Sequence, residues 1–65
     1  MKIYEVTHYY ATENIEISDT ETSELDYALR IARESAPVMR NAETRVWEKD
    51  GVGRNFKRNI LIAKM

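Results

Sequence analysis

A single stretch of helical periodicity, closed by a proline, lies between segments that alternate like β-strands. Apolar residues recur at three- and four-residue spacings, at Leu25, Ala28, Leu29, Ala32 and Ala36. Such positions share one face of an α-helix. Pro37 lacks an amide hydrogen and restricts the residue before it, so we expect the helix to end at or just before Ala36. One helix can cover only one face of a small sheet, and this limits the chain to an α+β arrangement.

The segments on either side of the helix predict two hairpins. Residues 2–12 are rich in β-branched and aromatic residues, and residues 15–17 alternate after a polar break at 13–14. Beyond the helix, residues 42–49 alternate, Asp50-Gly51 indicates a tight turn, and residues 56–64 form a last strand. The sequence therefore predicts a single ββαββ domain over residues 1–65. We expect a four-stranded antiparallel sheet with the helix packed on one face.

The start of the helix carries its own signal. Ser23 followed by Asp26 resembles a capping box, in which each residue satisfies a free backbone N–H of the first turn. Acidic residues around this point also suit the positive end of the helix dipole. We therefore expect the Ser23 side chain to cap the helix.

Side-chain alternation divides each strand between two faces of the sheet. The expected core beneath the helix consists of Tyr4, Val6, His8, Tyr10, Ile15, Ile17, Ala42, Thr44, Val46, Phe56, Ile60 and Ile62. The opposite face then carries an apolar and aromatic set that we interpret as partner-binding, namely Ile3, Tyr9, Arg45, Trp47 and Leu61. Two alternatives remain open: a bulge could turn Trp47 to the core side, or long Lys and Arg stems could cover it.

Charge is distributed unevenly along the chain, although the net charge is only −1. Residues 1–29 contain one base and seven acids, whereas residues 30–65 contain nine bases and four acids. Such asymmetry is typical of an interaction surface. It also fits a sheet in which strands from the two halves pair and neutralise one another.

No motif for catalysis, metal binding or cofactor binding is present. His8 is the single histidine and there is no cysteine, so a common zinc site cannot form, and we expect His8 to be structural or at the surface. The acids lack calcium-loop spacing, and the serines have no histidine base at a recognisable spacing. Gly51 and Gly53 lie in a hairpin turn and not between a strand and a helix, which excludes a phosphate loop. We expect a protein that is not an enzyme.

Nucleic-acid binding is the alternative function. On the C-terminal hairpin, five bases and one aromatic residue form the candidate set, namely Arg45, Trp47, Lys49, Arg54, Lys57 and Arg58. Basic charge with an aromatic platform can bind single strands. Charge removal at Arg54, Lys57 and Arg58 would weaken such binding. Against this alternative, the isoelectric point is about 5.8, whereas nucleic-acid-binding domains are often basic.

In size, charge and layout, the chain resembles the small orphan proteins of bacteriophages and mobile elements, which include anti-CRISPR and other anti-defence proteins. The resemblance implies a non-enzymatic interaction module that binds and inhibits a larger host protein. A chain of 65 residues has a narrow stability margin, which favours a homodimer. No stretch approaches the roughly 18 apolar residues of a membrane span, so we expect a cytoplasmic protein.

Overall fold

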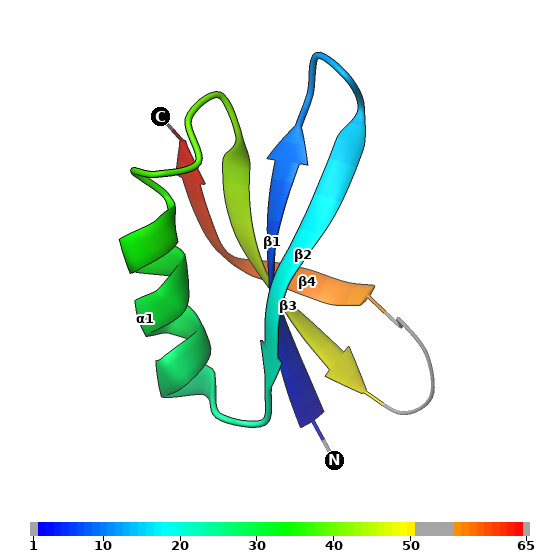
Figure 1. The fold of residues 1–65 in the computed structure, drawn as a ribbon. Helices are drawn as coiled ribbons and strands as arrows, with labels where there is room; N and C mark the ends of the chain where they lie inside the picture. Colours follow the sequence, from blue (N-terminus) through cyan, green and yellow to red (C-terminus); the bar gives the residue numbers. More distant parts are fainter. Residues whose placement is uncertain (1, 51–55, 65) are drawn as a thin grey trace.

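The computed structural model describes residues 2–49 in full, together with the backbone of residues 50 and 56–64. Its elements follow in the order β1 (Lys2–Tyr10), β2 (Ile15–Thr22), α1 (Leu25–Ser35), β3 (Glu43–Asp50) and β4 (Phe56–Lys64). Helix α1 packs on one face of an antiparallel sheet in which β1 lies between β2 and β3 (Figure 1). These elements confirm the predicted α+β class. The backbone of β4 runs beside β3, in the order β2-β1-β3-β4.

Helix α1 has the predicted extent but not the predicted cap. It ends at Ser35, and the amide of the following residue, Ala36, still donates a hydrogen bond to the Ala32 carbonyl at 3.0 Å. Glu24, with extended backbone angles, occupies the N-cap position and makes no side-chain cap. The Thr22 hydroxyl instead accepts a hydrogen bond from the Glu24 amide at 3.1 Å. The predicted Ser23 capping box is therefore wrong, because the helix begins one residue too late for the Ser23 side chain to cap it.

The core lies between α1 and the central strands. Ala28 and Ala32 of the helix are fully buried against Val6 of β1 and Val46 of β3. Side chains as small as alanine let the helix backbone lie close to the sheet, so little volume remains between the two layers. The partly buried side chains of Tyr4, Leu29 and Ile31 pack against this core. The predicted core residues Phe56, Ile60 and Ile62 have side chains outside the described part of the chain.

The β1–β2 hairpin turns where the polar break predicted it. The Asn14 amide donates to the Ala11 carbonyl at 3.2 Å, and Asn14 adopts a positive φ of 55°. Asparagine accepts this left-handed conformation more readily than most residues do. Strand β2 then extends to Thr22, well beyond the predicted 15–17. Its pairing with β1 shifts register between Val6 and Thr7, which leaves Asp19 as an inserted bulge residue.

Ile15 and Ile17 are exposed, which corrects their expected place in the core. They lie on the same side of the sheet as His8 and α1, but their side chains are 50% and 46% exposed. Helix α1 has 11 residues and is about 16 Å long, whereas the nine residues of β1 span about 30 Å. The helix therefore stops short of the end of the sheet that carries the β1–β2 turn (Figure 1).

Candidate functional site

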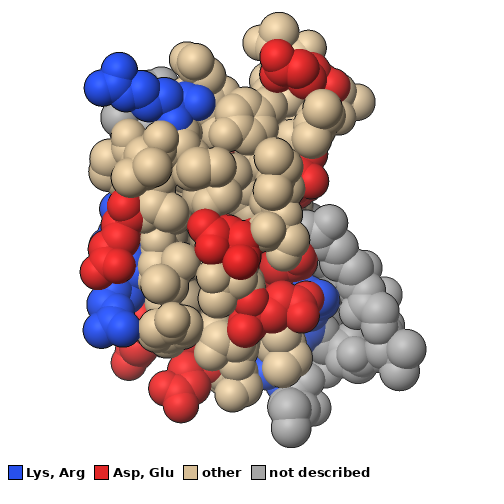
Figure 2. All heavy atoms as spheres, viewed as in Figure 1, with Lys and Arg blue, Asp and Glu red and all other residues tan. Residues whose placement is uncertain are grey.

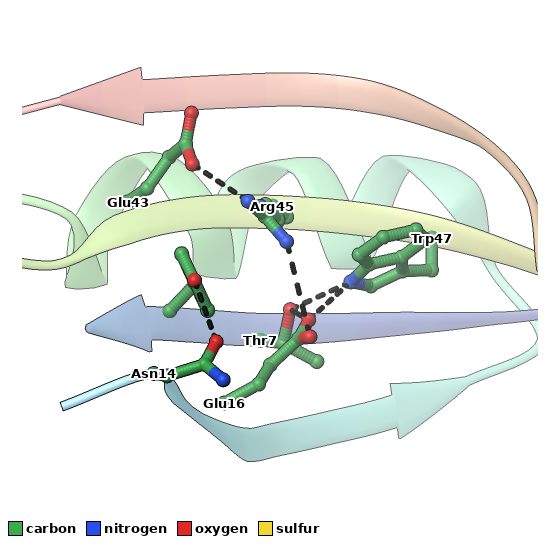
Figure 3. Close-up of polar contacts among 7 residues, drawn as sticks. Thr7, Asn14, Glu16, Glu43, Arg45 and Trp47 are labelled. Carbon is green, nitrogen blue, oxygen red and sulfur yellow. Dashed lines mark hydrogen bonds and ion pairs between the residues drawn. The ribbon is translucent and has the colours of Figure 1, made fainter. Parts of the chain in front are cut away.

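The face of the sheet opposite α1, here called the second face, carries a polar network centred on Glu16. The Trp47 indole N–H donates to the Thr7 hydroxyl at 2.6 Å and to the Glu16 carboxylate at 2.8 Å (Figure 3). Thr7 in turn donates to the same carboxylate oxygen at 2.5 Å. The three side chains come from β3, β1 and β2, and charge-assisted hydrogen bonds of this kind are short and strong. The network therefore joins three neighbouring strands across the second face.

Arg45 lies over the same network. Its guanidinium is 2.8 Å from the Glu43 carboxylate and 3.8 Å from that of Glu16. It also lies 4.4 Å from the ring centre of Tyr9 and 5.6 Å from that of Trp47, both within cation–π range. The cation is thus held by two carboxylates and two aromatic rings of its own chain. A foreign cation or base would have to displace it to reach those rings.

At the other end of the second face, Lys49 pairs with two acids. Its ammonium lies 3.8 Å from the Glu5 carboxylate and forms an ion pair with Glu21. Glu5 is nearly buried, so this nearby cation lowers the cost of keeping a carboxylate there. Lys49 and Arg45 are bases of the C-terminal half, whereas Glu5, Glu16 and Glu21 are acids of the N-terminal half. Cross-strand neutralisation, one of the two explanations for the charge asymmetry, is therefore observed.

The structure brings together three of the five residues predicted to bind a partner: Tyr9, Arg45 and Trp47. Trp47, however, is only 9% exposed, which corrects the expectation of an open tryptophan. Its N–H is satisfied within the chain because the polar side chains of β1 and β2 reach it. Ile3 lies further along β1, opposite Lys49 in the register, and is half-buried. The Leu61 side chain, Arg54, and the side chains of Lys57 and Arg58 lie outside the described residues.

A second polar network is buried on the helix side of the sheet. His8 is 1% exposed, and its Nε2 lies 2.8 Å from a carboxylate oxygen of Asp19. Its Nδ1 lies 3.0 Å from the hydroxyl oxygen of Thr44. The hydrogen bond from His8 lowers the pKa of the Asp19 carboxyl below its ordinary 3.8, a larger effect than the opposing one of burial. The ionised Asp19 can only accept, so Nε2 carries the proton, and in a neutral ring Nδ1 accepts from Thr44.

Thr44, His8 and Asp19 are the residue types of a nucleophile, a base and an orienting acid. The Thr44 side chain is nevertheless fully buried beneath α1, with no exposed surface for a substrate to approach. The arrangement therefore connects β3, β1 and the β2 bulge and gives no support to acyl transfer. Strand alternation does not predict this arrangement, because Asp19 is an inserted residue of the bulge.

Strand β2 presents an accessible edge that carries exposed apolar side chains. It pairs with β1 on one side and forms an edge of the sheet. Its first half carries the exposed Ile15 and Ile17. Figure 2 shows acidic side chains gathered over the β1–β2 turn, β2 and the start of α1. Residues 11–29 contain six acids and no Lys or Arg, and five of these acids are exposed, namely Glu13, Asp19, Glu21, Glu24 and Asp26.

Searches of protein-family models, curated proteins and solved structures find no match to this chain. Within the described part of the chain, no group of three or more His, Cys, Asp or Glu residues could hold a metal ion. The helix described here is too short and too polar to cross a membrane. The geometry of β2 and of the two polar networks is thus the basis for inferring a function.

Proposed function

We propose that the chain is a four-stranded ββαββ domain that acts as a non-enzymatic protein-interaction module and inhibits a larger protein, as small phage and mobile-element proteins do. The observation that carries the proposal is the edge strand β2, with Ile15 and Ile17 exposed beside acidic side chains. A two-residue apolar patch on a sheet edge is an unfavourable feature that proteins usually cover or break up with lysine or proline. Strand β2 contains neither of these residues, and both isoleucines lie before the bulge at Asp19, which interrupts only the second half of the strand.

The state of the polar side chains also supports a binding role. Thr44 and His8 are buried, and Arg45 is held by its own carboxylates and rings, so these groups stabilise the fold and are not presented to a substrate. Interaction modules need a rigid scaffold that presents a patch, and two networks that connect neighbouring strands would supply that rigidity. The proposal therefore assigns the networks to structure and the β2 edge to binding.

Affinity capture from the extract of a candidate host cell tests the proposal. The immobilised wild-type chain should retain a partner protein saturably and in a fixed ratio. Val38→Lys provides a matched control, because Val38 is 75% exposed and belongs to the connector between α1 and β3 and not to β2. That variant should retain the same partner. If neither protein retains any partner above a blank surface, the proposed function is wrong.

The homodimer expected from the small size is tested by light scattering behind a sizing column at several concentrations. If the mass remains that of a monomer at every concentration, the exposed patch of Ile15 and Ile17 would be available for a different protein. A mass that doubles with concentration would show self-association, and the variants described below would then locate its surface.

A further inference from the structure

We propose that the β2 edge binds an extended, basic segment of the partner protein, which adds to the sheet as an antiparallel strand. This inference rests on the proposed function and specifies the chemistry of the partner. An edge strand presents backbone N–H and C=O groups to an incoming strand, and added strands of this kind are a recurrent mode of peptide recognition. Residues 15–18 of β2 pair with β1 in a regular register up to the bulge at Asp19, and they offer a continuous edge for such a ladder.

The two faces of β2 specify different side chains on the incoming strand. Ile15 and Ile17 lie on the helix side, beyond the end of α1, and are about half exposed. Apolar side chains of the incoming strand would pack beside them, because directly opposed side chains of antiparallel strands are within contact distance. On the second face, β2 presents Glu16 and Glu21. Their positions follow from the register, because they pair with Tyr9 and Glu5 of β1, which lie on that face. An incoming strand that alternates apolar and basic residues would match both faces.

Charge selects a basic segment over a second copy of this chain. The stretch from Ala11 to Leu29 holds six acids without a Lys or Arg (Figure 2). Two of these acids, Glu16 and Glu21, lie against bases of β3, and the others leave this edge with a net negative charge. Glu21 has an exposed side chain at 51% even with Lys49 beside it. Antiparallel pairing of β2 with β2 of a second copy, about the middle of the strand, would place Glu16 of each copy opposite Glu21 of the other. Like charges in opposed positions destabilise a sheet. A basic strand would be attracted, most strongly at low ionic strength.

A capped eight-residue peptide of alternating valine and lysine is the probe for this site, added to the isotope-labelled chain and followed by NMR. We expect shifts of the backbone amides confined to β2 and the β1–β2 turn, with a Kd of roughly 1 mM or tighter. The corresponding valine–glutamate peptide should give no shifts. Added salt should weaken the binding of the lysine peptide.

Ile17→Lys places a cation on the edge and removes an apolar contact, so it should weaken binding of the valine–lysine peptide at least about tenfold. The matched Val38→Lys variant also replaces an exposed aliphatic side chain by lysine, but outside β2, and should bind as the wild type does. Both variants must give wild-type-like amide spectra outside the substituted region. Ile15→Lys provides a second edge substitution if Ile17→Lys perturbs the fold.

Three results would overturn the inference. One is the absence of β2 shifts at saturating valine–lysine peptide, and another is equal binding by Ile17→Lys and Val38→Lys. The third is a concentration-dependent dimer that Ile17→Lys abolishes and Val38→Lys keeps, because the edge would then belong to a second copy. Partner capture separates this failure from that of the proposed function. If Ile17→Lys still retains the captured partner, the module binds through another surface; if the wild type captures none, the proposed function itself is wrong.

Discussion

The indole N–H of Trp47 on β3 donates a hydrogen bond to the carboxylate of Glu16 on β2, 2.8 Å away, across the whole width of the intervening strand β1. Thr7 on β1 lies between them and bonds to both. A sheet-spanning contact of this kind fixes the position of the edge strand relative to the centre of the sheet. Because β2 also carries the proposed binding patch, the network that stabilises the fold also orders the site.

Trp47→Phe tests the contribution of this network. The substitution keeps an aromatic ring but removes the N–H donor. The Thr7 hydroxyl and the Glu16 carboxylate then each lose a hydrogen bond at a site that is largely shielded from water. We expect the free energy of unfolding to fall by about 1–3 kcal/mol. Urea denaturation followed by circular dichroism measures it. Tyr27→Phe, at a 41% exposed position on α1, is the comparison and should change the stability by less than about 0.5 kcal/mol. Equal effects of the two substitutions would argue against the network.

Asn14 has two functions that different substitutions separate. Its side chain accepts a hydrogen bond from the Tyr9 hydroxyl at 2.8 Å, and its backbone adopts a positive φ. Asn14→Gly loses only the hydrogen bond, whereas Asn14→Ala also strains the backbone. We therefore expect the alanine variant to be the less stable by about 1 kcal/mol, measured by urea denaturation. At the neighbouring Glu13, which has no positive φ, Glu13→Ala should be more stable than Glu13→Gly. If alanine were the less stable substitution at both sites, the backbone of Asn14 would not explain the difference.

Val46→Ala and Val38→Ala remove the same two methyl groups from opposite environments. Val46 is fully buried in the core and Val38 is 75% exposed. Burial of a valine side chain is worth about 1.5–3 kcal/mol, a large part of what a domain of this size has. We expect Val46→Ala to lower the thermal midpoint markedly and Val38→Ala to leave it nearly unchanged. Similar midpoints for the two variants would show that the core is placed incorrectly.

The stability should depend on pH through Asp19. The hydrogen bond from His8 lowers the pKa of this carboxyl in the folded chain below the ordinary value of 3.8. A depressed pKa contributes stability that is fully present above the unfolded-state pKa and is lost as the pH falls through the folded-state pKa. We therefore expect the unfolding free energy to decline below about pH 4, and to decline less steeply in Asp19→Asn. If the unfolding free energies of the two proteins fell equally steeply with decreasing pH, Asp19 would not be the group responsible.

Several features follow from local sequence alone. The apolar spacing from Leu25 and the presence of Pro37 predict α1 to within one residue at its end, because helical period and proline chemistry act within a few residues. The turn before Ile15 is predicted for the same reason, since a polar break between β-forming segments is a local property. Alternation also places Val6 and Val46 correctly beneath the helix.

Other features were decided by the tertiary structure. Alternation assigns Ile15 and Ile17 to the helix side but cannot tell that α1 ends before it covers them. It cannot reveal the bulge that brings Asp19 to His8. Nor does alternation indicate that Glu16 accepts a hydrogen bond from the Trp47 indole, or that Trp47 is nearly buried on the second face. The sequence by itself therefore determined the helix, the strands β1 to β3 and the inward-facing sides of β1 and β3, through interactions between near neighbours. Only the tertiary structure decided which sides are covered, because coverage depends on element lengths, strand register and side chains that meet from distant parts of the chain.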